Sequence, residues 1–167
     1  MLIVMRNDVN QTNKKLSEKE ILNKLSRFCA FQERAVSDLI NYLKKYRLGP
    51  GQRDTIIRKL ITEGFVNEER FAKTYMLGKL RNNQWGRIKI IRGLRGKVVD
   101  EEIISKVIGT LDEEEYIAVI DHLIKKKGSI LKDEEIFIRK HKIARYMMYK
   151  GFEGDIVWEQ INKSIGC

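Results

Sequence analysis

The stretch QWGRIKIIRGLRGKVVDEEI, residues 84–103, contains the signals from which the fold can be built. Basic and apolar side chains share residues 87–97 at helical spacing, and Gly96 offers a place for that helix to end. Asp100 and the two glutamates after it then offer a helix start, because an Asx side chain accepts unpaired backbone N–H groups and glutamates favour the positive end of the helix dipole. The stretch therefore predicts a basic helix joined by a tight turn to a second helix.

The same start and stop signals recur along the chain. Asx-Glu-Glu starts lie at 67–69, 100–102, 112–114 and 133–135, a capping box lies at 17–20, and glycine stops lie at 64, 96, 128 and 151. Pro50 is expected to open a helix at its first position. Apolar residues at helical spacing fill the intervals, and no alternating stretch of strand length competes. We predict an all-α chain with helices near 17–30, 33–46, 51–63, 67–82, 86–96, 100–110, 112–127, 133–150 and 154–165.

The helices are expected to repeat in threes. Aligning Gly96 with Gly151 places a basic helix, a glycine, an acidic cap and an apolar helix at the same spacing twice, and the first third has the same order with Leu43 over Leu94. Such repeats stack into an elongated, curved body with a continuous core. We expect three tandem three-helix repeats at 16–64, 65–111 and 112–167, after a polar arm at 1–15.

Composition excludes several classes of protein. With 43% hydrophobic and 34% charged residues in 167, we expect a soluble globular chain. No apolar run approaches the roughly 18 residues of a membrane span, and the apolar stretch 1–5 is too short for a signal peptide, so no membrane and a cytoplasmic location are expected. The two cysteines form no metal-binding spacing, so neither a disulfide nor a metal site is predicted.

The net charge of +10 is unevenly distributed. Residues 70–99 contain nine cations and no acid, and residues 136–152 form a second acid-free basic stretch. Such stretches attract nucleic acid or an acidic protein face, unless they are simply solvated helix faces.

Helical spacing separates an apolar side from a charged side in the first basic helix. The apolar side is predicted to contain Ile88, Ile90, Ile91 and Leu94. Lys89 and Arg92 are predicted to point away from it and are the first candidates for contact with a partner. Trp85 is a candidate either to stack on a base or a partner or to anchor packing. The other candidate partner-binding cations are Arg87, Arg95, Lys97, Arg139, Lys140, Lys142 and Arg145.

No enzymatic motif is visible. The chain has no phosphate-binding GxxxxGK[ST] loop, and neither His122 nor His141 has a second metal ligand at helical spacing. We expect no catalytic residue, no metal and no cofactor, and therefore a protein that is not an enzyme.

Several segments in a fixed order resemble the RecX family of bacterial recombination regulators, from about residue 25 to 161. They are CAFQER at 29–34, ERFA at 69–72, WGRI at 85–88, and Arg145-Tyr146 followed by KGF at 150–152. The chain differs from the usual family pattern at Arg87, where proline is frequent, and at Gly93, where an acidic residue is frequent.

The resemblance implies three tandem three-helix repeats and a negative regulator of RecA. Such a regulator binds along the groove of the RecA–single-stranded DNA filament and suppresses its ATP hydrolysis, strand exchange and stimulation of repressor self-cleavage in repair, recombination and the SOS response. We expect a monomer with the RecA nucleoprotein filament as partner. Two alternatives remain: direct binding to single- or double-stranded DNA by helix-turn-helix pairs, and a scaffold that recruits acidic peptides.

Overall fold

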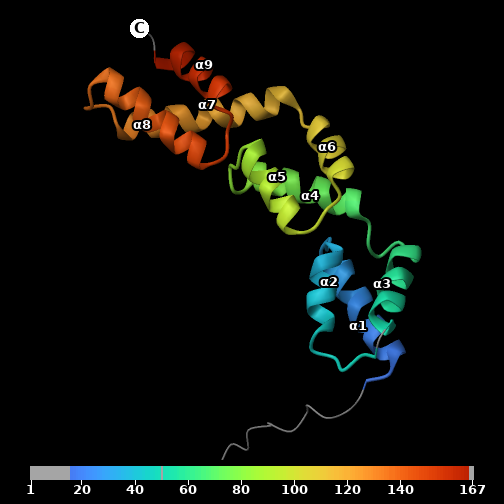
Figure 1. The fold of residues 1–167 in the computed structure, drawn as a ribbon. Coiled ribbons are helices and arrows are strands. Elements are labelled where there is room, and N and C mark those ends of the chain that lie inside the picture. The colour runs from blue at the N-terminus through green and yellow to red at the C-terminus, as the bar shows by residue number, and fades with distance from the viewer. Residues whose placement is uncertain (1–15, 50, 166–167) are drawn as a thin grey trace, which may run out of the picture.

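The computed structural model describes residues 16–49 and 51–165, and throughout these ranges every regular element is a helix (Figure 1). The helices are α1 (Glu18–Phe31), α2 (Val36–Leu43), α3 (Gln52–Thr62), α4 (Glu68–Arg81), α5 (Arg87–Gly96), α6 (Glu101–Gly109), α7 (Glu113–Ile130), α8 (Ile136–Tyr149) and α9 (Gly154–Ile165). They follow one another as three three-helix repeats in an elongated, curved body, with α1 and α9 toward opposite ends. The predicted all-α repeat fold is confirmed, while the expected N-terminal arm and the Pro50 turn lie outside the described residues.

Most of the predicted helix ends follow from local chemistry. The Ser17 side chain accepts from the backbone of Glu20 in a complete capping box, and the side chains of Asn67 and Asp112 each accept from the backbone N–H three residues on. Gly64 and Gly151 adopt the left-handed conformation expected after a helix, with φ of 76° and 88°. These boundaries were predictable because residues close in sequence determine them.

The boundary between α7 and α8 differs from the prediction. α7 continues through Gly128 to Ile130, and α8 begins at Ile136, after the predicted cap Asp133, with no side-chain bond from its N-cap Glu135. Gly128 lies inside the helix, and a Cβ built there would lie 3.7 Å from the Cδ1 of Ile143 on α8. Apolar packing between α7 and α8, which includes Ile143 on α8 and Leu131 directly after α7, outweighs the small cost of glycine in a helix.

The register between the second and third repeats also differs from the prediction by two residues. The left-handed residue after α5 is Val98, with φ of 60°, and it corresponds to Gly151 after α8. The next residues, Val99 and Phe152, are both buried, and each donates its backbone N–H to the carbonyl five residues earlier. The alignment on Gly96 was wrong because that glycine ends α5 two residues before the turn itself.

The core is not continuous, contrary to the prediction. One buried cluster joins the helices of the first repeat, and a second joins α4 to α9. Polar contacts connect the two parts: the Lys97 ammonium pairs with Asp38 at 2.7 Å, the Ser37 hydroxyl donates to the Lys97 carbonyl at 2.7 Å, and Arg70 pairs with Glu33. Ala35 is the residue before α2 that joins the second cluster.

The junction between the second and third repeats is formed instead by backbone in direct contact. The Gly86 N–H donates to the Lys150 carbonyl and the Ile88 N–H donates to the Gly151 carbonyl, both at 3.0 Å. A Cβ at Gly86 would lie 2.2 Å from the Gly151 oxygen, and a Cβ at Gly151 would lie 2.3 Å from the Cβ of Lys89. Both glycines are needed for this approach, which fixes the start of α5 against the end of α8.

We expect Gly86→Ala to destabilise the protein by about 1–3 kcal/mol, because its methyl group has to displace the backbone at Gly151. Gly78→Ala is the matched control, since it lies inside α4 with nothing within 4 Å of the added Cβ, and it should stabilise by about 0.5–1 kcal/mol. Urea denaturation measures both free energies of unfolding. Equal midpoints for the two variants would contradict the importance of this contact.

Candidate functional site

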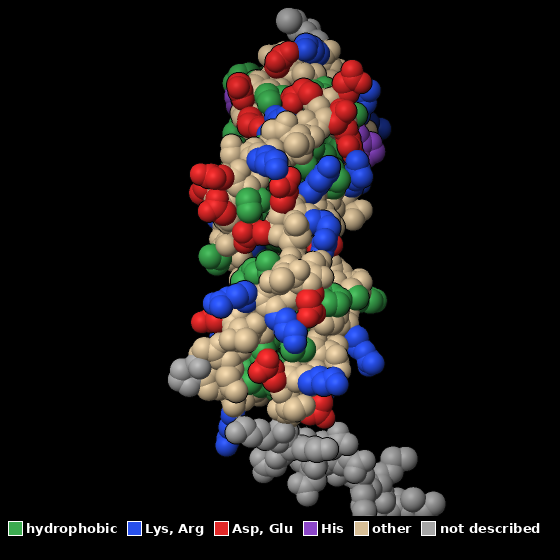
Figure 2. Space-filling model, turned by 90° about the vertical axis from the view of Figure 1, so that its right-hand side faces the viewer, with side chains coloured by type: hydrophobic (Ala, Val, Ile, Leu, Met, Phe, Trp, Pro, Cys, Tyr) green, Lys and Arg blue, Asp and Glu red, His purple; other side chains and the backbone are tan. Residues whose placement is uncertain are grey.

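Positive and negative side chains lie side by side on the surface of this molecule. On the face shown in Figure 2, Lys and Arg side chains are interspersed with Asp and Glu along the length of the molecule. Cations on such a face are neutralised locally. A partner surface therefore requires cations that have no carboxylate beside them.

Arg87 is used inside the protein. Its guanidinium pairs with Glu113 and Glu153 and lies 4.0 Å from the centre of the Tyr116 ring, and its side chain is only 18% exposed. Tyr116 donates its hydroxyl to Glu153 and accepts the backbone N–H of Arg87. Burial, followed by the hydrogen bond to Glu153, raises the pKa of Tyr116, so that hydroxyl remains a donor. Arg87 thus ties α5 to α7 and to the loop before α9.

Three other candidates form ion pairs within the chain. Arg95 makes a two-pronged contact with Glu101, at 2.6 and 2.9 Å, and Lys97 pairs with Asp38 across the first junction. Lys142 pairs with Glu134, just before α8. The acidic helix starts that the sequence offered as caps therefore also neutralise part of the predicted basic surface.

Lys89 lies among aromatic rings. Its ammonium group lies 4.8 Å from the centre of the Trp85 ring and 4.9 Å from that of Tyr149, and the Lys79 ammonium lies 5.2 Å from Tyr75 and 4.8 Å from Trp85. No carboxylate in the described ranges pairs with either lysine. We call these five residues, Tyr75, Lys79, Trp85, Lys89 and Tyr149, the lysine–aromatic row. It crosses the second junction, from α4 through α5 to α8.

Two expectations about α5 need correction here. Lys89 is half-buried rather than fully exposed, because its stem packs on Gly151, while Arg92 is exposed as predicted. Ile88, expected on the apolar side, is 47% exposed, since its backbone docks on Gly151 and leaves Ile90 and Leu94 to fill the core.

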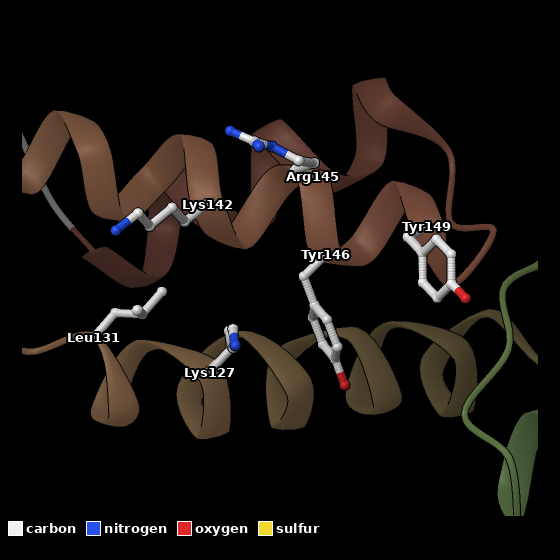
Figure 3. A pocket seen from close by; sticks show the side chains of 6 residues that line it. All are labelled: Lys127, Leu131, Lys142, Arg145, Tyr146 and Tyr149. Atoms are coloured by element: carbon white, nitrogen blue, oxygen red, sulfur yellow. The ribbon is translucent and has the colours of Figure 1, made fainter.

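A groove between α7 and α8 continues this surface (Figure 3). It has a volume of ≈ 400 Å³ and is lined by Lys127, Leu131, Lys142, Arg145, Tyr146 and Tyr149. Figure 3 shows the Tyr146 ring reaching from α8 toward α7, and Tyr149 at the end of the groove. Tyr149 belongs to both the groove and the lysine–aromatic row, so the two form one surface.

Lys127 and Lys150 meet at the Tyr146 ring, where the row adjoins the groove, and the Lys127 ammonium lies 5.3 Å from the ring centre. The Lys150 ammonium donates to the Asn83 carbonyl at 3.0 Å and lies 5.7 Å from the centre of the Tyr146 ring. Burial, and repulsion from Lys89 and Lys126, lower the pKa of Lys150. The site therefore has a positive potential that an anion would relieve.

The remaining candidates are placed differently. Arg92 and Arg145 are exposed and have no carboxylate partner within 16–49 and 51–165, and Arg145 lines the groove. Lys140 donates to the Asn162 side chain at 3.2 Å, and the Nε of Arg139 is buried without a hydrogen-bond partner in the described part of the chain. The structure thus gathers Trp85, Lys89, Lys142 and Arg145 on one surface, where Lys142 is paired with Glu134. It places Arg87, Arg95 and Lys97 in ion pairs within the chain.

The sequence analysis missed most of the aromatic residues of this surface, although a local signal exists. An aromatic residue precedes a lysine by four positions three times, at 75 and 79, at 85 and 89, and at 146 and 150. Residues four apart share one face of a helix, which brings Tyr75 to Lys79 on α4 and Tyr146 to Lys150 at the end of α8. Trp85 lies just before the N-cap of α5, and its ring still meets Lys89. The order in which the three pairs adjoin depends on the second junction and is not visible in the sequence.

Among the described residues, no three His, Cys, Asp or Glu side chains lie close enough to hold a metal ion. His141 instead packs between Phe137 and Trp158, with ring centres 4.2 and 5.0 Å away. No helix in the described ranges has both the length and the apolar character needed to cross a bilayer.

Family models match two parts of the chain. Residues 67–108 match the second three-helix domain of RecX, and residues 112–161 match the third. Among curated proteins, the regulatory protein RecX of Clostridioides difficile is 26% identical over 147 residues, covering 88% of this chain and 60% of that protein. The regulatory protein RecX of Listeria monocytogenes is 28% identical over 138 residues, covering 81% of this chain and 50% of that protein. The chain spans about half of the length of these relatives.

Solved structures show the same fold. The crystal structure of RecX from Lactobacillus salivarius superposes with a TM-score of 0.80 at 19% identity, covering 88% of this chain and 96% of that one. A second crystal structure of a regulatory protein RecX gives a TM-score of 0.77, also at 19% identity, over 87% of this chain and 73% of that one.

Two arginines of α5 provide a test of the internal ion pairs. Arg87→Ala should destabilise the protein by about 2–3 kcal/mol, somewhat less than a fully buried pair, because Glu153 loses its cationic partner below the surface. Arg95→Ala, which breaks an exposed pair in the same helix, should leave the midpoint of urea denaturation almost unchanged. If the two variants were equally stable, Arg87 would not be a structural residue.

Proposed function

The chain belongs to the RecX family, and on that premise we propose that it is a negative regulator of RecA. It binds the filament that RecA forms on single-stranded DNA and suppresses the filament's ATP hydrolysis, strand exchange and coprotease activity. It acts in the cytoplasm, in DNA repair and recombination and in the SOS response, and it acts by binding rather than by catalysis.

The observation that carries this proposal is a continuous surface of cations without carboxylate partners in the described residues, on adjacent repeats of an elongated body. The lysine–aromatic row and the α7–α8 groove contribute Lys79, Lys89, Lys127 and Arg145 to it. A filament wound on DNA offers phosphates and protein carboxylates along its groove, and both attract such cations. An elongated chain of repeats can follow that groove over several contacts (Figure 1).

Reading of duplex DNA by helix-turn-helix pairs is less well supported. In the second and third repeats the last helix would be the recognition helix, and its N-terminal residues would face the DNA. Those residues are Glu101 and Glu102 in α6 and Asp155 in α9, which duplex phosphates repel. The basic surface lies instead on α4, α5, α7 and α8.

The proposal is tested by DNA-dependent ATP hydrolysis of RecA from the same species, with the full chain titrated in below one copy per RecA. We expect strong inhibition at these ratios. The double variant Lys89→Glu/Arg145→Glu should lose at least tenfold in inhibitory potency, because two contacts with anions become repulsive.

The double variant Arg58→Glu/Lys59→Glu is the charge-matched control, since both residues are exposed on α3 in the first repeat, and it should inhibit like the unaltered protein. Absence of inhibition at excess protein, with RecA shown to be active, would refute RecA regulation. Full inhibition by the double variant would remove this surface from the contact.

A further inference from the structure

The lysine–aromatic row alternates rings and ammonium groups along its length. Tyr75, Lys79, Trp85, Lys89 and Tyr149 follow one another, with each ammonium between 4.8 and 5.2 Å from the ring centres on either side of it. A single strand of nucleic acid presents base faces and phosphates in the same alternating manner. Stacking on rings and pairing with cations is how proteins bind single strands without reading sequence.

Tyr149 is the ring most open to stacking. Its side chain is 79% exposed at the end of α8, although a large apolar side chain usually seeks burial. Figure 3 shows its ring projecting from α8 at the end of the groove. A base stacked on this ring would bury its apolar face, whereas a duplex has no unstacked base to offer.

The lysine cluster supplies the complementary phosphate site. Lys127 and Lys150 lie 5.3 and 5.7 Å from the centre of the Tyr146 ring, Lys89 lies 4.9 Å from that of Tyr149, and none of the three pairs with a carboxylate in the described ranges. A phosphate at the cluster therefore lies next to two rings that can receive its bases.

The surface is held in place before any ligand binds. The backbone bonds from Gly86 and Ile88 to the end of α8 fix Trp85 and Lys89 relative to Tyr149. A preformed surface loses less conformational entropy on binding than a surface that has to become ordered when the ligand arrives.

We propose that the lysine–aromatic row and the adjoining α7–α8 groove bind single-stranded nucleic acid directly, with bases stacked on Tyr149 and Trp85 and phosphates held by Lys89, Lys127 and Lys150. This goes beyond regulation of RecA, because it requires no RecA. Single-stranded DNA and single-stranded RNA both present the bases and phosphates that this surface would bind, and the 2′-hydroxyl of RNA distinguishes them.

Binding is measured on the full chain without RecA, by fluorescence anisotropy of labelled oligodeoxythymidine, oligouridine and a duplex of equal length. We expect a single strand to bind at least tenfold more tightly than the duplex, and the logarithm of the affinity to fall with the logarithm of salt by about 0.7 per phosphate contacted. Whichever of the two single strands binds better identifies the source of the ligand. No binding to either strand, or equal binding to the duplex, overturns the proposal.

Matched variants separate stacking from charge. Tyr149→Ala should weaken binding by about fivefold or more, whereas Phe31→Ala, which removes an 87% exposed ring from the first repeat, should not change it. Lys127→Glu should weaken binding and reduce the salt dependence, whereas Lys59→Glu should have little effect on either. Unchanged binding by both Tyr149→Ala and Lys127→Glu overturns the assignment of the site.

Trp85 gives an independent readout. The chain has two tryptophans, so Trp158→Phe leaves Trp85 as the sole emitter. Its fluorescence should be quenched by oligodeoxythymidine and should not be quenched by polyglutamate, which carries charge without bases. Equal quenching by polyglutamate would identify a general polyanion surface and overturn the stacking model. None of these assays contains RecA, so they test this proposal separately from the function proposed above. If the protein binds single strands but does not inhibit RecA, only that function is contradicted.

Discussion

The close approach of Gly86 to Gly151 is the contact on which the arrangement of the second and third repeats depends. Two backbone hydrogen bonds cross it, and a methyl group on either glycine would meet neighbouring atoms at 2.2 or 2.3 Å. The same contact brings the stem of Lys89 onto Gly151 and its ammonium beside Tyr149. A constraint on the backbone thus becomes a constraint on the surface, since the lysine–aromatic row has residues on both sides of the junction.

Cations that look alike in the sequence have different roles within the one helix α5. Arg87 is held by two glutamates and a tyrosine ring, Arg95 faces Glu101 in solvent, and Lys89 lies between two rings. An acid-free stretch of sequence is therefore not an acid-free surface, because its carboxylate partners come from the next helix or from other repeats. What distinguishes Lys89 is that its neighbours across the junction are aromatic and not acidic.

The sequence predicted what local interactions determine. Helices and most of their caps were predictable, because Ser17, Asn67 and Asp112 bond within one turn. The end of α7 and the register of the third repeat were not, since they depend on packing between α7 and α8 and on a left-handed Val98. Of the candidate site, the basic stretches were predictable and the rings beside them were not, because packing between repeats decides which side chains adjoin.

The contrast between the two junctions has a mechanical consequence. Apolar packing and backbone contact hold α4 to α9 together as one unit. The first repeat is attached to this unit mainly by ion pairs and a hydrogen bond. Among the described residues of the first repeat, only Ala35 belongs to the core of that unit. The attraction within surface ion pairs weakens as the salt concentration rises, because the Debye length, about 8 Å at physiological ionic strength, becomes shorter. The first repeat is therefore expected to change its angle to the other two repeats more easily than those two change their angle to each other. A change of angle at this junction adapts the curvature of the protein to partners of different helical pitch. It leaves undisturbed the rigid part that carries the lysine–aromatic row.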